Sequence, residues 1–117
     1  MAKKYTTEEH VLQRQAESLA MMLGWLVVRV NSGAYSDGKR YLRFYVIANT
    51  GESAGLSDLI VFKNGTAIFL EIKRPKQRQT PAQKRFEALA TGYNMEYYVV
   101  DNITDAGTIL RKQREES

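Results

Sequence analysis

The stretch LSDLIVFKNGTAIFLEIK, Leu56 to Lys73, is the part of the chain that decides the fold. Two apolar runs rich in β-branched residues flank Asn64-Gly65. This dipeptide supplies the positive φ angles that a two-residue type I′ hairpin turn requires. The pattern predicts an antiparallel hairpin in which Lys63 lies opposite Thr66, and residues farther from the turn pair so that their numbers keep the same sum.

This register places Asp58 directly opposite Glu71, in one of the close pairs whose Cα atoms lie roughly 4.5 Å apart. Like charges in that position destabilise a strand pair, so we expect a cation between them, with a divalent metal as the obvious choice. Lys73 follows Glu71 by two residues and therefore projects from the same face. Two carboxylates that can hold Mg²⁺, beside a lysine that can orient a water or stabilise negative charge, suit phosphodiester cleavage.

A simpler interpretation makes Asp58 the first residue of a strand and leaves Glu71 and Lys73 at a solvated strand end. The neighbouring residues argue against it, because a strand that is apolar on both sides is covered on both faces. These neighbours are Ile60, Val61, Phe69 and Leu70. The pattern therefore favours a buried site.

Three segments, Asp58, Glu71-Ile72-Lys73 and Thr80-Pro81-Ala82-Gln83, resemble the motifs of the PD-(D/E)xK nuclease superfamily. Within that superfamily the chain resembles the VRR-NUC (virus-type replication-repair nuclease) family. The similarity runs from about Thr7 to Asp101. It departs from the family pattern at Ser57, where the family often has proline.

The resemblance implies a Mg²⁺-dependent DNA endonuclease, with Mn²⁺ as a substitute, that hydrolyses phosphodiester bonds. It assigns Asp58, Glu71 and the main-chain carbonyl of Ile72 to the metal, and Lys73 to the hydrolytic water. It also maps a first-helix glutamate of the family onto Glu9, which would touch the metal directly or through water. Glu9 has a simpler explanation too, since a glutamate suits the positive end of a helix dipole.

Gln83 likewise has two explanations. Thr80-Pro81-Ala82-Gln83 predicts a helix start with Thr80 as N-cap, proline at the first position and Gln83 in a capping box. The resemblance instead places the Gln83 amide in the active site. We expect that one side chain cannot serve both roles fully at once. His10, the only histidine, is expected to lie on the surface of the first helix.

The net charge of +4 favours a polyanionic partner such as nucleic acid. Basic residues crowd the segment after Glu71, although a solvated basic loop is the alternative. Aromatic and basic residues also alternate between residues 35 and 45, where they can stack on bases and neutralise phosphates. The expected DNA contacts are Asn31, Arg40, Arg43, Arg74, Lys76, Arg78 and Lys84.

The 117 residues have the length of one domain, residues 1–117. We expect an α/β, restriction-endonuclease-like mixed sheet in the order helix, three strands, helix, strand, helix, with helices on both faces. The expected helices are Thr6 to Leu23 with Thr6 or Thr7 as cap, the segment starting at Thr80 and ending at Gly92, and Thr104 to Arg114 with Thr104 or Asp105 as cap. The expected strands besides the hairpin are Trp25 to Asn31, Tyr41 to Ile47 and Glu96 to Val100, with loops at Ser32 to Lys39 and Asn49 to Gly55.

Cysteine is absent, so neither a disulfide nor a thiolate zinc site can hold the fold. No apolar leader follows Met1, and no apolar run approaches the ~18 residues of a membrane span. We therefore expect a soluble protein without a membrane partner, in the cytoplasm of a bacterial or phage-infected cell.

Two classes of function remain. The first is a nuclease acting on branched or duplex DNA in replication, repair or recombination, resembling a Holliday junction resolvase. The second is a non-cleaving nucleic-acid-binding module with the same fold, and an RNA-directed nuclease is a weaker third. The stand-alone family members that the chain resembles pair as homodimers, so we expect a homodimer, with Tyr41 to Ile47 and the closing helix near Ile109 and Leu110 as candidate interfaces.

Overall fold

The structure, a computed structural model, describes residues 4–30, 46–48, 51–53 and 57–114. The elements follow in the order α1 (Lys4–Met22), β1 (Leu26–Arg29), β2 (Val46–Ala48), β3 (Gly51–Ser53), β4 (Leu59–Lys63), β5 (Thr66–Ile72), α2 (Pro81–Gly92), β6 (Glu96–Val100) and α3 (Ile103–Arg111). Four strands form one sheet in the order β1-β4-β5-β6, and β2 and β3 form a separate two-stranded sheet.

The β4–β5 hairpin has the predicted register. Lys63 pairs with Thr66, and the ladder continues to Leu59 opposite Leu70. The two turn residues both have positive φ, 51° at Asn64 and 81° at Gly65, as a type I′ turn requires. The turn dipeptide therefore sets which side chains of the two strands share a face.

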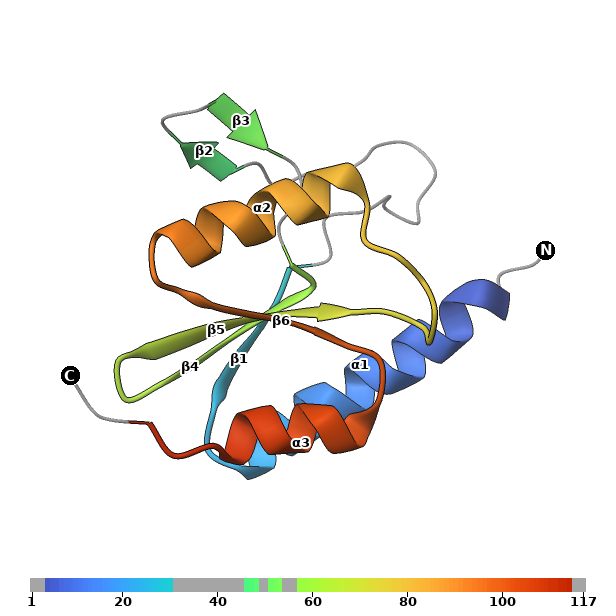
Figure 1. The fold of residues 1–117 in the computed structure, drawn as a ribbon. Helices are drawn as coiled ribbons and strands as arrows, with labels where there is room; N and C mark the ends of the chain where they lie inside the picture. The colour runs from blue at the N-terminus through green and yellow to red at the C-terminus, as the bar shows by residue number, and fades with distance from the viewer. Residues whose placement is uncertain (1–3, 31–45, 49–50, 54–56, 115–117) are drawn as a thin grey trace, which may run out of the picture.

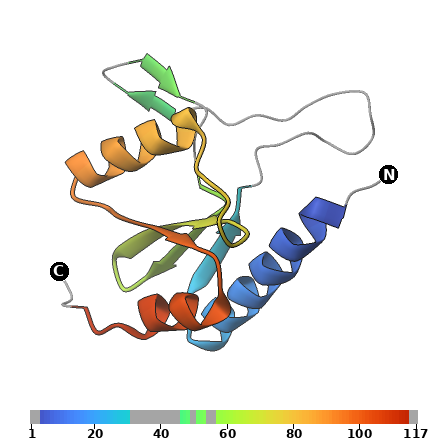
Figure 2. The same ribbon diagram turned by 45° about the vertical axis from the view of Figure 1, so that its right-hand side comes forward.

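Helices cover both faces of the main sheet. Helices α1 and α3 lie together on one face, and α2 lies on the other (Figures 1 and 2). Strand β6 follows α2 and pairs with β5 in the parallel direction, whereas β1 and β4 pair antiparallel. The expected α/β arrangement is confirmed, and the main sheet takes β1, β4 and β5 from before α2 and β6 from after it.

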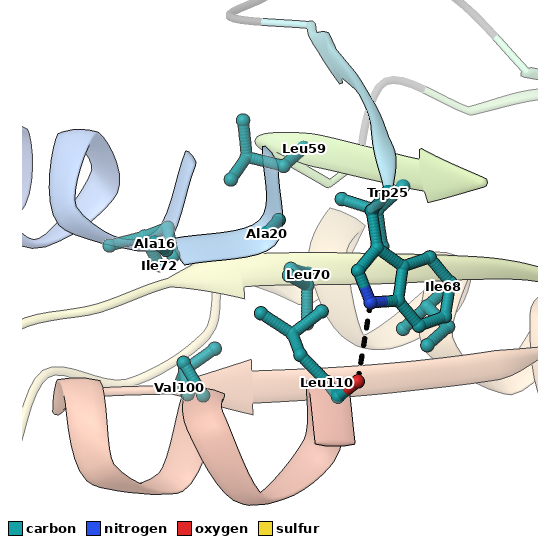
Figure 3. Close-up of a cluster of buried hydrophobic side chains, with 11 residues drawn as sticks. Ala16, Ala20, Trp25, Leu59, Ile68, Leu70, Ile72, Val100 and Leu110 are labelled. Carbon is teal, nitrogen blue, oxygen red and sulfur yellow. Dashed lines mark hydrogen bonds between the residues drawn. The ribbon is translucent and has the colours of Figure 1, made fainter. Parts of the chain in front are cut away.

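The larger core lies between the sheet and the α1–α3 layer. Alternate residues of β4 and β5 enter it, and Leu59, Val61, Ile68 and Leu70 are completely buried. Trp25 closes one end of this core (Figure 3), where its indole Nε1 donates to the carbonyl oxygen of Leu110 at 3.2 Å. A smaller cluster on the opposite face joins α2 to β5 and β6.

The closing helix contributes to this core, and that corrects one expectation. Leu110, expected at a dimer interface, is only 3% exposed and packs inside the molecule. Beyond the helix, Arg114 donates two hydrogen bonds of 2.8 Å to the Glu96 carboxylate. Its guanidinium also lies over the Trp25 ring, 5.8 Å from the ring centroid. The segment after α3 is thereby attached to β6.

Several boundaries differ from the expected ones. Helix α1 begins at Lys4, so neither Thr6 nor Thr7 is its cap. Helix α3 begins at Ile103, and its cap is Asn102, whose side chain accepts from the Asp105 backbone N–H at 2.8 Å. Asparagine is a favoured cap, and Asn102 follows the end of β6 at Val100 by two residues.

The region between β1 and β4 also differs. Gly51–Ser53, expected within a loop, is strand β3 and pairs with β2. Of the expected strand Tyr41 to Ile47, Val46 and Ile47 lie in β2, and residues 41–45 fall outside the described residues. The two-stranded sheet lies beside α2 in Figure 1, and β3 contacts that helix. In the ranges above, no helix is both long and apolar enough to cross a membrane.

The two faces of β4 give a direct test of this packing. We expect Leu59→Ala to lower the free energy of unfolding by about 2–5 kcal/mol, because it leaves a cavity in a fully buried position. Phe62→Ala, on the opposite face of the same strand and 38% exposed, should cost clearly less. Urea unfolding followed by circular dichroism measures both, and equal losses would contradict the assignment of the faces.

Candidate active site

The residues expected to carry chemistry meet at one end of β4 and β5, beneath the start of α2. Glu71 is the last residue but one of β5, Lys73 directly follows the strand, and Asp58 directly precedes β4. Phe69, two residues before Glu71, packs against Phe86 of α2 with ring centroids 5.1 Å apart. Glu71 therefore lies on the α2 face, away from the larger core.

Asp58 and Glu71 lie side by side, as the register predicts. The backbone ladder itself ends at Leu59 and Leu70, so Asp58 is not part of a strand pair. Its side chain takes the next position instead, where Oδ2 accepts from the backbone N–H of Ile72 at 2.8 Å. This bond orients Asp58 toward the end of β5, where each carboxyl group shifts the pKa of the other.

Burial makes this pair electrostatically costly. Glu71 is 2% exposed, and its burial, followed by the charge of Asp58, raises the pKa of Glu71 to about 8. Burial also raises the pKa of Asp58, although the Ile72 N–H opposes that shift. Lys73 Nζ lies 3.6 Å from Glu71 Oε2 and offsets only part of the cost. At neutral pH the pair holds a proton unless a further cation joins it.

One oxygen of this pair lacks a donor. Glu71 Oε2 receives the Gln83 amide and lies near Lys73, but the buried Oε1 receives no hydrogen bond from the described residues. A buried carboxylate oxygen without a donor is rare in native proteins. The proton that the pair holds at neutral pH can occupy this oxygen, and in its place Asp58 and Glu71 could hold a hard divalent cation, which prefers oxygen ligands.

Gln83 takes part both in the cap of α2 and in the candidate active site. Its Oε1 accepts from the Thr80 backbone N–H at 2.8 Å, and Thr80 Oγ1 accepts from the Gln83 N–H at 3.1 Å, which completes the capping box. Its Nε2 donates to Glu71 Oε2 at 2.6 Å. The expectation that the two roles compete is wrong, because they use opposite ends of one amide.

Glu9 lies near the pair without joining it closely. Its charge contributes to the raised pKa of Asp58, and its Oε2 lies 3.7 Å from Arg74 Nε. In the part of the chain that the structure describes, no three acidic, histidine or cysteine side chains gather into a metal-binding group. Its expected contact with a metal, directly or through water, stays a prediction. His10 is exposed on α1, as expected.

The expected DNA contacts are placed in part. Lys76, Arg78 and Lys84 are exposed around the entrance to α2. Arg74 is half-buried, and its backbone N–H donates to the Gln77 side chain at 2.9 Å in the tight turn after β5. The remaining three, Asn31, Arg40 and Arg43, lie outside the described residues.

The structure adds Tyr97 to the surroundings of the pair. Its ring packs against Phe86, and its hydroxyl accepts from Gln79 Nε2 at 3.4 Å. Burial, and then the nearby charge of Glu71, raise the pKa of Tyr97, so the phenol stays neutral. The sequence showed Tyr97 in a strand, but not that this strand pairs with β5 and sets Tyr97 opposite Phe69.

The raised pKa of Glu71 predicts how stability depends on pH when no divalent ion is present. An acid whose pKa is raised from 4.5 to about 8 on folding stabilises the folded state below pH 4.5, and this contribution is lost as the pH rises through 8. At about 1.4 kcal/mol per pKa unit, we expect a loss of a few kcal/mol between pH 5 and 9. Urea unfolding in EDTA measures it. Glu71→Gln should flatten the profile, and an unchanged slope would contradict this pKa.

Comparisons with known proteins agree with the architecture. Neither the protein-family models nor the curated proteins give a match to this chain. A solved structure described as a VRR_NUC domain superposes with a TM-score of 0.65, over 91% of this chain and 98% of that one, at 21% sequence identity. At this identity the likeness shows the fold, and the chain has the fold of that VRR_NUC domain.

Proposed function

We propose that the protein is a metal-dependent nuclease that hydrolyses phosphodiester bonds in DNA. The observation that carries this proposal is the buried pair Asp58 and Glu71, with Lys73 and Gln83 in contact with the same carboxylate. A pure binding module has no need of two buried carboxylates next to DNA phosphates, which they would repel. The VRR_NUC likeness supports the same class of activity.

The residues present fit a divalent cation. Asp58 and Glu71 would hold Mg²⁺, or Mn²⁺ in its place, with the main-chain carbonyl of Ile72 as a further ligand and Glu9 contributing through water. When bound, such an ion polarises the phosphoryl oxygens and makes a bound water more acidic. The donor-free oxygen of Glu71 and the excess negative charge of the pair are the features that support this assignment.

The other side chains of the site have roles of their own. The Lys73 ammonium, 8% exposed and held 3.6 Å from Glu71, orients the attacking water and stabilises the negative charge that grows on the phosphate. Gln83 fixes the rotamer of Glu71, because its own amide is fixed by the helix cap. Arg74, Lys76, Arg78 and Lys84 neutralise backbone phosphates of the bound DNA.

The substrate that we propose is branched or structured DNA in replication, repair or recombination within the cell. Cleavage should depend on Asp58, Glu71 and Lys73. We expect Asp58→Asn, Glu71→Gln and Lys73→Ala each to lower the rate by at least about 10²- to 10⁴-fold, with little change in DNA affinity, since each retains the fold and the basic surface. Labelled single-stranded, duplex, flap and four-way-junction DNA, with and without Mg²⁺, measures cleavage and binding together.

Asp105→Asn is the control, because it removes an exposed carboxylate from α3, on the other face of the sheet from Glu71 (Figure 1). It should cut at the wild-type rate. Wild-type cleavage by a site variant would remove that residue from the mechanism. DNA binding without cleavage in any metal would favour the non-cleaving module, and cleavage of RNA alone would favour the RNA-directed nuclease.

We further propose that the protein acts as a homodimer. One two-carboxylate site cuts one strand per encounter, whereas a branched substrate presents two strands related by an approximate two-fold axis that a dimer would match. The described residues offer an apolar surface for this contact on β1 and β4, where Leu26 and Phe62 pair and are 64% and 38% exposed.

Sedimentation at micromolar concentration tests the dimer. We expect twice the 13.4 kDa chain mass for the wild type. Leu26→Lys should shift the population to monomer, because it places a charge in the apolar contact. Met22→Lys, at an exposed methionine on α1, is the control and should leave the dimer intact. A monomeric wild type that still makes paired nicks in a junction would refute both the dimer and its purpose.

A further inference from the structure

A cavity of about 370 Å³, lined in part by Lys73 and Arg74, lies at the same end of the sheet as the proposed catalytic pair. It is bounded by the first half of α1, by the connection that follows β5, and by the start of α3, three segments that meet in Figure 2. It opens at the carboxyl ends of the parallel strands β5 and β6, where α/β sheets commonly bind ligands.

The cavity shares two consecutive residues with the proposed active site. Lys73 and Arg74 both line it. Lys73 also contacts Glu71, and Arg74 lies 3.7 Å from Glu9, whose charge acts on Asp58. A nucleotide whose phosphate sits at the site therefore has this cavity next to it.

Part of the cavity wall is aliphatic. Val11, Leu12, Pro75 and Ile103 line it, and Val11 is 52% exposed on α1 despite being a large apolar residue. A volume near 370 Å³ is at the low end of the range for small-molecule sites, roughly 300–1,000 Å³. A flat, weakly hydrated group of the size of a nucleobase suits both this volume and these walls.

The polar residues at the rim select which part of a nucleotide can enter. Glu8 and Asp101 are acidic and exposed, so a phosphate would be repelled from the interior. Asp101 accepts one hydrogen bond, from Asn102 Nδ2 at 2.8 Å, which leaves acceptor capacity on its carboxylate. Carboxylates accept from the exocyclic amino groups of bases, whereas Lys73 and Arg74, which also line the cavity, suit the adjoining phosphates.

We propose that this cavity binds one unpaired nucleobase of the DNA strand that is cut, with a preference for bases that carry an amino group over thymine. The inference rests on the proposed nuclease function and deepens it. A base inside the cavity cannot be paired, so a regular duplex must first lose a pair at that position. Strands that already hold an unpaired nucleotide, as at a branch or a flap, do not need to lose a base pair. The protein should therefore bind them in preference to a regular duplex.

An abasic scan tests the proposal without relying on cleavage. Short single strands, each with one nucleotide replaced by an abasic analogue, are bound to the full chain in EDTA, and affinity is followed by fluorescence anisotropy. We expect one position at which removal of the base weakens binding by roughly ten- to a hundredfold. Replacing the base at that position by thymine should weaken binding less than removing it, but more than replacing it by adenine or cytosine.

Two variants assign the effect to the cavity. Val11→Trp fills it from an exposed position and should make the scan flat, whereas Met21→Trp, exposed on the same helix outside the cavity, should behave like the wild type. Asp101→Asn should weaken the preference for amino-bearing bases, because an amide presents one acceptor oxygen where the carboxylate presents two.

The outcomes separate this inference from the function on which it rests. A flat scan in a wild type that binds and cuts DNA overturns the base site and leaves the nuclease proposal standing. A position-specific loss that persists in Val11→Trp also overturns it, because the base then binds elsewhere. Failure of every strand to bind overturns the base site, and absence of cleavage in Mg²⁺ as well overturns both proposals.

Discussion

The carboxyl groups of Asp58 and Glu71 lie together where the β4–β5 pairing ends, and the electrostatic cost of burying them is the constraint on which the site depends. The Asn64-Gly65 turn fixes the register, and the bond from the Ile72 N–H prevents the Asp58 side chain from moving away. The Glu71 carboxylate cannot move into water either, because it is buried beneath α2. The packing of the hairpin must therefore offset the cost of burying the two carboxyl groups together. A bound cation would offset part of the same cost.

Strand β5 meets this demand because its two faces differ. Leu70 and Ile72 enter the larger core between the sheet and the helices α1 and α3, where both are almost completely buried. Phe69 and Glu71 point the other way, toward α2. The apolar side of β5 thus packs in the core, and its other side carries the residues of the candidate site. A substitution in the site therefore need not disturb the residues that hold the strand in place.

The parts that the sequence predicts are those that depend on local geometry. The Asn64-Gly65 turn determines the pairing, which ends at Leu59 opposite Leu70, and Asp58 and Glu71 are the next residues beyond that pair. The contribution of Tyr97 could not be found in this way, because a parallel neighbour is chosen by how a helix packs across the sheet and not by any nearby residue. Helix ends are also harder to predict from the sequence, because Asn102, Thr104 and Asp105 are all favourable cap residues.

The two-ended use of the Gln83 amide has a consequence for how the protein ages. The side chain needs an acceptor toward Thr80 and a donor toward Glu71 at the same time, and among the common side chains of its length only the amide has both. Spontaneous deamidation would turn the donor into a carboxylate and set a second negative charge beside a pair that already shares a proton. A change of one atom, invisible to most assays of folding, would therefore disable stored protein.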